Sequence, residues 1–155
     1  MKKRRLRKSE IKELSSKLHQ LYGTDFDKKE ELEEAIIGNI KTIMKDKTPI
    51  FFFYKDTPIP TLKKCIENCF LKKIIVDMGA IKFVTSGADI MRPGITELDE
   101  NIKPEEFAVV VDENNQKPLA IVRALYSGQK IKEMEKGKVL ENIHYIGDDI
   151  WRIHQ

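Results

Sequence analysis

The C-terminal half of the chain is built from short apolar runs that are separated by turn residues. A β-hairpin is predicted by Phe107–Asp112 and Pro118–Tyr126, which flank the polar segment ENNQK. A short buried strand is predicted at Lys72–Asp77, and residues 139–153 predict two final strands around a turn at 147–148. This half therefore has five or six short strands but only two short helices. Because so little helix cannot cover an open sheet, we expect a small closed or nearly closed barrel.

The N-terminal half leaves two interpretations open. It begins with a predicted helix that Ser9 caps and Gly23 ends. The apolar face of this helix contains Ile11, Leu14, Leu18 and Leu21. Local propensity then favours a second helix from Lys28 to about Lys45. A three-stranded meander fits nearly as well, because Gly38–Asn39 and Asp46–Lys47 are turn signals.

Positive charge is concentrated at the N-terminus. The chain has 155 residues and a net charge of +3, but six cations and no acid lie within residues 2–8, KKRRLRK. Such a run is most often a solvated arm, and less often it contacts phosphates. We therefore expect residues 1–8 to form a basic arm, which would add non-specific phosphate affinity if it is ordered on RNA.

The sequence predicts no metal, no cofactor and no membrane segment. Cys65 and Cys69 lie four residues apart on a helix predicted to begin at Pro60, but two thiols without a nearby histidine make an incomplete metal site. We expect both to be buried core thiols. No apolar run approaches the roughly 20 residues of a membrane span, and the N-terminus lacks an apolar signal region. We therefore expect a cytoplasmic protein.

The segment Asp77–Gly94, DMGAIKFVTSGADIMRPG, predicts a strand end, a very short helix and another strand. Asp77 can accept hydrogen bonds from the first turn of the helix, and Gly87 suits a left-handed helix end. Gly79 and Ala80 carry almost no side chain, so another backbone can come close. The spacing alone does not decide whether that backbone belongs to the barrel itself or to a ligand.

Three motifs in this order and spacing resemble one protein family. They are PIPTLKKCIENCF, VDMGAIKFVTSGADIMRPG and ENIHYIGDDIW. The second resembles the signature of the PUA domain, an RNA-binding pseudobarrel. Together the motifs are similar to the malignant T-cell amplified sequence one family, and the chain looks like an archaeal-type relative. The resemblance implies an α+β protein with a small N-terminal domain at 1–72, packed on a PUA pseudobarrel of mixed strands and two short helices at 73–155. It also favours the meander over the long helix.

The resemblance implies a non-catalytic RNA-binding protein that acts in translation. Its RNA would be ribosomal RNA or tRNA, bound during initiation, reinitiation or recycling. Its partners would be the small ribosomal subunit and a translation factor resembling density-regulated protein. The alternatives are a protein-interaction adaptor and an accessory RNA-binding subunit of an RNA-modification enzyme. The residues before the barrel are too few for a synthase domain, and no nucleophile–base pair accompanies the histidines.

Carried over position by position, the resemblance places RNA against the glycine-fenced helix, the strand after it and the final strands. The candidate residues are Lys72, Lys73, Gly79, Ala80, Lys82, Ser86, Gly87, Ala88, Asp89, Arg92 and His144. Small residues admit a ribose-phosphate, Ser86 can bind its oxygens, and lysine or arginine supplies charge. Phe83 lies on the apolar stripe of the helix, so we expect it, like Trp151, in the core.

Overall fold

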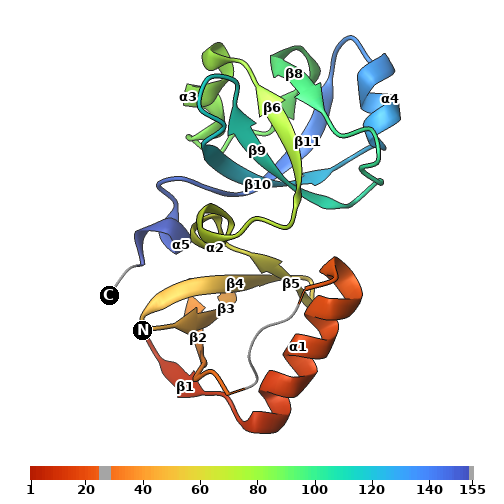
Figure 1. Ribbon diagram of the computed structural model, residues 1–155. Coiled ribbons are helices and arrows are strands. Elements are labelled where there is room, and N and C mark those ends of the chain that lie inside the picture. Colours follow the sequence, from red (N-terminus) through yellow and green to blue (C-terminus); the bar gives the residue numbers. More distant parts are fainter. Residues whose placement is uncertain (25–28, 154–155) are drawn as a thin grey trace.

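The computed structural model describes residues 1–24 and 29–153, which form two β-sheets joined by a short helix (Figure 1). The N-terminal sheet has five strands in the order β1-β2-β3-β4-β5. Their bounds are Lys3–Arg5 for β1, Glu33–Ile37 for β2, Ile40–Lys45 for β3, Thr48–Tyr54 for β4 and Thr57–Pro60 for β5. All the pairings in this sheet are antiparallel. The meander is thus confirmed, and the alternative of a long helix is wrong.

The turns of the meander explain why it prevails over helix propensity. Gly38 has φ 63°, and both Asp46 and Lys47 have positive φ. Such left-handed residues terminate a helix but close a tight hairpin with the right twist. Once the strands pair, their apolar residues collect in a core with helix α1, Lys8–Tyr22. The packed residues from helix and sheet include Ile11, Leu14, Leu18, Ile43 and Phe51.

Helix α1 begins two residues earlier than the sequence predicts. Arg7, not Ser9, is the N-cap, and its backbone N–H donates to the carboxylate of Glu10 at 2.9 Å. The predicted end is confirmed, because Gly23 has φ 70° and its N–H donates to the carbonyl oxygen of His19. Both ends of the helix are therefore capped by local hydrogen bonds.

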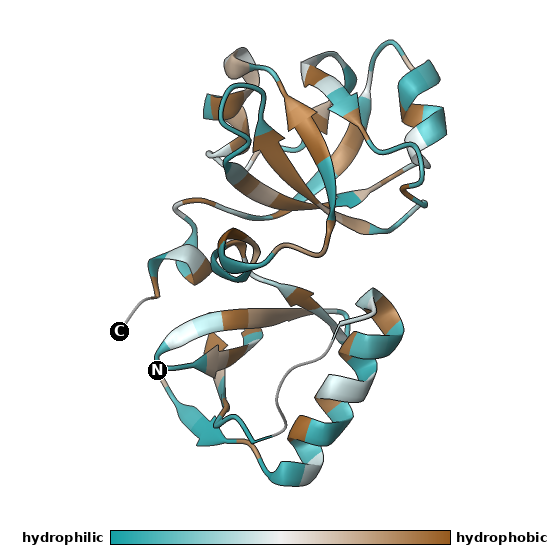
Figure 2. Ribbon diagram, in the orientation of Figure 1, coloured by the Kyte–Doolittle hydropathy of each residue, from teal (hydrophilic) through white to brown (hydrophobic). Residues whose placement is uncertain are grey.

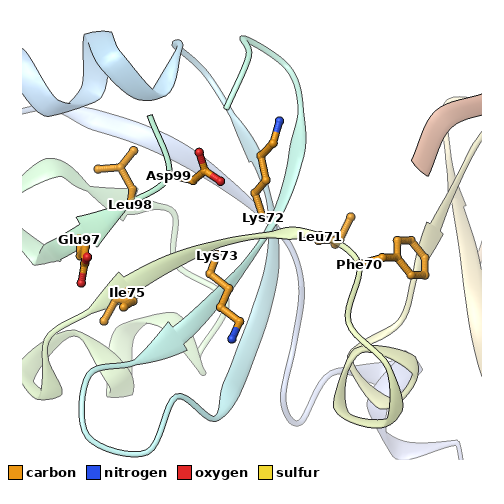
Figure 3. Close-up of a pocket in the computed structure, with 8 residues that line it drawn as sticks. All are labelled: Phe70, Leu71, Lys72, Lys73, Ile75, Glu97, Leu98 and Asp99. Carbon is orange, nitrogen blue, oxygen red and sulfur yellow. The ribbon is translucent and has the colours of Figure 1, made fainter. Parts of the chain in front are cut away.

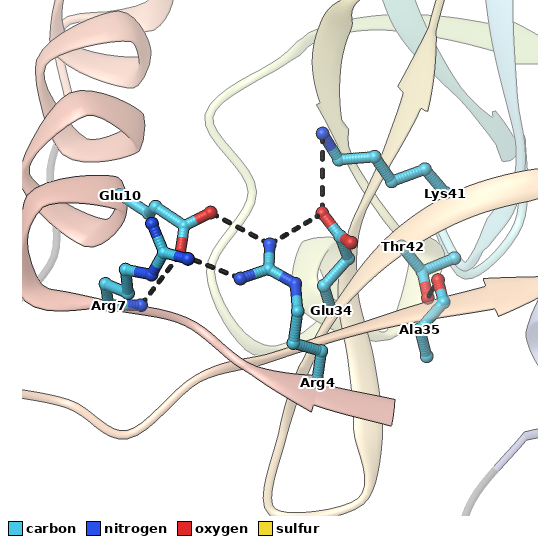
Figure 4. Close-up of polar contacts among 7 residues, drawn as sticks. All are labelled: Arg4, Arg7, Glu10, Glu34, Ala35, Lys41 and Thr42. Carbon is cyan, nitrogen blue, oxygen red and sulfur yellow. Dashed lines mark hydrogen bonds and ion pairs between the residues drawn. The ribbon is translucent and has the colours of Figure 1, made fainter. Parts of the chain in front are cut away.

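The predicted basic arm is an edge strand instead of a solvated tail. Strand β1 pairs antiparallel with β2, and Arg4 donates two hydrogen bonds of 2.9 and 2.8 Å to the carboxylate of Glu10 (Figure 4). The Oε1 atom of Glu34 forms two further ion pairs, at 3.4 Å from the guanidinium of Arg4 and at 3.5 Å from the Nζ atom of Lys41. The hydrogen bonds from Arg4, together with the one from the Arg7 backbone N–H, lower the pKa of Glu10 to about 2. Acids that are distant in sequence thus compensate part of the N-terminal charge.

The C-terminal sheet has six strands in the order β7-β11-β10-β9-β6-β8 and curls around its own core. The bounds are Lys72–Val76 for β6, Ile90–Met91 for β7, Ile95–Leu98 for β8, Phe107–Asp112 for β9, Pro118–Ala124 for β10 and Lys138–Tyr145 for β11. Strands β6 and β9 are parallel and the other pairs antiparallel, as a mixed pseudobarrel requires. Figure 2 shows apolar residues running along β6 and β9.

The end of the chain differs from the prediction of two final strands. Only β11 is a strand, and after the turn the chain forms the short helix α5, Asp149–Arg152. The Oδ1 atom of Asp148 accepts from the N–H of Trp151 at 2.9 Å, so Asp148 caps the helix. The missed helix signal was a capping acid, Asp148, two residues before the apolar pair Ile150–Trp151.

Two further helices support the C-terminal sheet and the junction. Helix α2, Leu62–Glu67, lies between the sheets, and Thr61 caps it by accepting from Lys64 N–H at 3.2 Å. Helix α4, Gly128–Glu133, is capped in the same way by Ser127.

The two sheets share a continuous core. It combines Phe52 and Ile59 of the N-terminal sheet with Leu62 of α2, Ile121 of β10 and Ile150 of α5. Trp151 packs against this core but stays partly exposed, so the expectation of a core tryptophan holds only in part. The two cysteines differ likewise: Cys65 is buried and Cys69 is half-buried.

Candidate functional site

Strand β6 ends at the segment that the sequence singles out, and the chain turns there into a tight helical element. The first turn is a 3₁₀ helix, Met78–Ala80, followed by α3, Ile81–Val84. Asp77 caps it as predicted, with Oδ1 accepting from Ala80 N–H at 2.9 Å. The N–H of Met78 donates to the carboxylate of Glu113 at 3.2 Å, which fixes the start of the helix to the β9–β10 turn.

The small residues of this segment serve different purposes. A Cβ atom at Gly87 would meet the ring of Tyr145 at 2.8 Å, and Gly87 has φ 94°. This glycine is therefore required by the protein's own packing and backbone conformation. At Gly79 a Cβ would meet only Asp77 Oδ1 at 3.4 Å, an ordinary contact, and Gly79 is exposed. Gly79 thus leaves room for an external ligand.

Phe83 is an exposed aromatic residue, so the expectation that it lies in the core is wrong. Its exposed fraction is 56%, while its neighbour Val84 is buried. The ammonium of Lys82 lies 5.2 Å from the centroid of the Phe83 ring. The spacing of Ile81 and Val84, three residues apart on one helical turn, was the signal that these two face inward and that 82 and 83 face outward.

Two methionines near Phe83 in sequence are also exposed. Met78 is 44% exposed and Met91 is 52% exposed. Large apolar side chains that are exposed close together indicate an interaction site, whereas single ones are common on protein surfaces. Residues 78–91 therefore expose three large apolar side chains together with the side chain of Lys82.

The structure brings most of the predicted site residues to this segment. Gly79, Ala80, Lys82, Ser86, Gly87 and Ala88 all belong to the helical element and the turn after it. Asp89 faces β11, where it accepts from Asn142 N–H at 2.9 Å and lies 3.4 Å from Lys138. Arg92 has an internal role, since its guanidinium donates to the carbonyl oxygens of Ile131 at 2.7 Å and Ile95 at 3.1 Å.

Lys72 and Lys73 lie apart from that surface, at the start of β6. Because β6 runs from 72 to 76, about 13 Å of strand separates them from the helical element. They border an open hollow of about 530 Å³, and their side chains point to opposite faces of the strand (Figure 3). The Nζ atom of Lys72 lies 3.0 Å from Oε2 of Glu106, and the Nζ atom of Lys73 donates to Oε1 of Gln116 at 3.4 Å. The structure therefore does not place them in one site with Lys82.

His144 is a structural residue between the two sheets, which corrects its place among the candidates. Its exposed fraction is 0%. Nδ1 lies 2.7 Å from Asp148 Oδ2, and Nε2 accepts from the backbone N–H of Leu62 at 3.1 Å. The edge of the Phe52 ring completes its surroundings, with the centroids 5.4 Å apart. A side chain so enclosed has no free atom for RNA, so we remove it from the candidate site.

The carboxylate of Asp148 makes this contact sensitive to acid. Burial by itself raises its pKa, but the hydrogen bond and charge attraction of His144 and the N–H groups of Trp151 and Tyr145 lower the pKa below its ordinary value. A depressed folded pKa adds stability that is present above the unfolded pKa, about 4, and is lost as pH falls through the folded value. We expect Asp148→Asn to flatten the decline of the unfolding free energy below about pH 4.

The measurement is urea unfolding across an acidic pH series. Asp149→Asn is the matched control, because Asp149 is exposed and adjacent. The control should keep the decline of the wild-type protein. Equal flattening by both substitutions would contradict a specific role for Asp148.

The described residues contain neither a metal-binding cluster nor a membrane-spanning helix. Within residues 1–24 and 29–153, no group of three or more histidine, cysteine or acidic side chains could hold a metal ion. No helix in the same ranges is long and apolar enough to cross a membrane.

Comparison with known proteins identifies both halves of the chain. Residues 72–146 match the family model of the PUA domain, and residues 2–68 match one described as a domain of unknown function, DUF1947. The crystal structure of the hypothetical protein PH0734.1 from Pyrococcus horikoshii has the same fold, with a TM-score of 0.83 and 34% identity. That similarity covers 97% of this chain and 98% of the other.

Relatives in other organisms extend the match. Uncharacterized protein MJ1432 of Methanocaldococcus jannaschii is 43% identical, over 94% of this chain and 93% of that protein. Translation machinery-associated protein 20 of Eremothecium gossypii is 35% identical, over 93% of this chain and 84% of that protein. Rat malignant T-cell-amplified sequence 1 is 36% identical, over 67% of this chain and 60% of its own length. The chain therefore belongs to the family of PUA-domain proteins that includes translation machinery-associated protein 20 and malignant T-cell-amplified sequence 1.

Proposed function

We propose that this protein is a non-catalytic RNA-binding factor of translation and that it binds RNA through the surface of α3 and the turn after it. The observation that carries the proposal is the exposed Phe83 ring with the Lys82 ammonium beside it. An exposed aromatic ring next to a cation matches the two needs of an unpaired nucleotide: a platform for the base and a charge for the phosphate.

The surroundings of Phe83 fit the same ligand. Lys82, Ser86 and Ala88 are exposed, and Gly79 leaves its backbone open to close approach. The hydroxyl of Ser86 donates to Phe83 O at 2.8 Å, so its oxygen is still able to accept.

The names of the relatives support a role in translation. Translation machinery-associated protein 20 is named for an association with the translation machinery. Its similarity to this protein covers 93% of this chain. We propose that this protein acts in the cytoplasm on the small ribosomal subunit or tRNA, with a partner resembling density-regulated protein. We also propose that residues 1–72 and 73–155 are two domains, of which the second contacts the RNA.

Replacement of Phe83 should weaken RNA binding and leave the fold intact. Loss of base stacking costs about 1–3 kcal/mol, so Phe83→Ala should raise the Kd for single-stranded RNA by roughly 5- to 150-fold. Because the ring is mostly exposed, the unfolding free energy should change by less than about 0.5 kcal/mol. Fluorescence anisotropy with a labelled oligonucleotide measures the first quantity, and urea denaturation measures the second.

Tyr126→Ala is the matched control for that substitution. Tyr126 is also an exposed aromatic residue of the C-terminal half. It follows strand β10 and is not part of the proposed surface. It should bind RNA like the wild-type protein. Unchanged binding by Phe83→Ala, or an equal loss in Tyr126→Ala, would contradict the proposed surface.

The broader function is tested by sedimentation with purified small ribosomal subunits over a salt series, with free tRNA as competitor. Co-sedimentation that weakens with salt and is lost in Lys82→Glu with Phe83→Ala is the expected result. Tight binding to tRNA without co-sedimentation would favour a role in tRNA handling or modification. Binding to neither would favour the adaptor alternative.

A further inference from the structure

A side chain of strand β11 holds the turn that follows helix α3. Within the turn, Ser86 and Ala88 N–H groups both donate to Phe83 O, at 3.2 and 3.1 Å, and Gly87 N–H donates to Val84 O at 3.1 Å. These bonds close the turn on itself but do not attach it to the sheet. The attachment comes from Asn142 on β11.

Asn142 binds both ends of the turn. Its Nδ2 donates to Val84 O at 3.0 Å and to Ala88 O at 3.0 Å, while its backbone N–H donates to Asp89 Oδ1 at 2.9 Å. Two carbonyl acceptors require the amide NH₂ group on that side, so the orientation of the side chain is fixed by chemistry. One residue thus spans the turn from its first to its last position.

This arrangement leaves the other end of the Asn142 side chain unsatisfied. Among the residues that the structure describes, its Oδ1 is a buried acceptor with no hydrogen-bond partner. An unpaired buried acceptor costs free energy, and such exceptions in a native fold call for an explanation. Asn142 therefore holds the turn through its NH₂ group, although its unpaired Oδ1 atom lowers the stability of the fold.

Tyr145 gives the turn a second anchor on the same strand. Its ring packs so closely on Gly87 that a Cβ atom at position 87 would lie only 2.8 Å from a ring carbon. Lys138, at the start of β11, lies 3.4 Å from Asp89. Strand β11 thus supports the turn from below, while Lys82, Phe83 and Ser86 face solvent above it.

We propose that Asn142 is a positioning residue, which holds the α3 turn in the conformation that binds an unpaired nucleotide. This inference rests on the proposed function, because it assigns the preorganisation of that same surface. If the turn opens, only a fraction of molecules is competent, and the apparent affinity falls by that fraction. Asn142 itself need not touch RNA.

Asn142→Asp tests the inference with little change in shape. It replaces the NH₂ donor by an oxygen that repels both carbonyls, and we expect roughly ten-fold weaker binding of single-stranded RNA. Hydrogen exchange at Ser86, Gly87 and Ala88 should become faster. Asn142→Ala removes the donors without adding charge and should act in the same direction. Asn39→Asp, on the exposed β2–β3 turn, is the charge-matched control and should bind normally.

A double-mutant cycle separates positioning from direct contact of Asn142 with the RNA. If Asn142 acts only through the fraction of molecules whose turn is closed, Lys82→Ala should weaken binding by the same factor in the Asn142→Asp background as in the wild-type protein. Strong coupling between the two substitutions, or normal affinity in Asn142→Asp despite faster exchange, would overturn the inference. Failure of the wild-type protein to bind any RNA would instead overturn the proposed function, so the two failures are distinguishable.

Discussion

Truncation of His144 to alanine should destabilise the protein by about 3 kcal/mol. The substitution removes a buried ring that packs on Phe52, and it leaves the buried N–H of Leu62 without an acceptor. It also takes from Asp148 the partner of its Oδ2 atom. Because the imidazole joins both sheets, we expect the loss to appear in the unfolding of the whole chain. Urea denaturation followed by circular dichroism measures it.

His144→Gln is the informative companion variant. A glutamine oxygen can accept from an N–H group, so this variant should recover part of the loss. His144→Phe fills the volume without offering an acceptor and isolates the cost of the hydrogen bond. A change below about 1 kcal/mol in His144→Ala would show that the contact between the sheets does not depend on this residue.

Alanine at position 128 should cost a similar amount, about 3 kcal/mol, for a different reason. Gly128 opens α4 directly against the chain after β8, and its N–H donates to Ile102 O at 2.8 Å. An added Cβ would collide with the carbonyl oxygen of Asp99 and lie 3.0 Å from the Cα of Glu100. Backbone cannot rotate away as a side chain can, so the helix has to shift. Thermal and urea unfolding measure the effect.

Gly79→Ala is the matched control for Gly128→Ala. Both glycines lie outside the left-handed region, but the nearest atom to a Cβ at 79 is a side-chain oxygen at 3.4 Å. The control should change the unfolding free energy by less than about 0.5 kcal/mol. Comparable losses at both positions would show that the contact with Asp99 is not the cause.

Periodicity and turn chemistry predicted the C-terminal strands because each signal there was local. The strand at β6, the hairpin of β9 and β10, and the caps at Asp77 and Gly87 all depend on residues within a few positions of one another. The N-terminal sheet was harder to predict, because strands rich in Glu and Lys have the local propensity of a helix. Only the turn residues between them favour strands. Strand β1 was missed altogether, since its partners Glu33 and Ala35 lie about thirty residues away.

The candidate site was predictable in place but less so in detail. The glycine-fenced segment is where the exposed Phe83 and Lys82 lie, yet the sequence assigned Phe83 to the core. Lys72 and Lys73 looked adjacent to the site because they are near it along the chain, but a strand separates them. Asn142 lies in the motif ENIHYIGDDIW, but its role could not be predicted, because its partners Val84 and Ala88 become neighbours only when β11 joins the sheet.

The folding of the basic N-terminus into strand β1 has a practical consequence for experiments on charge. Deleting residues 1–8 to test electrostatic attraction to RNA would also remove an edge strand and the ion pairs of Arg4 with Glu10 and Glu34. A weaker complex would then report a damaged sheet as readily as a missing charge. Charge reversal at Lys3, whose side chain is exposed at that edge, changes the electrostatic field while the strand remains paired.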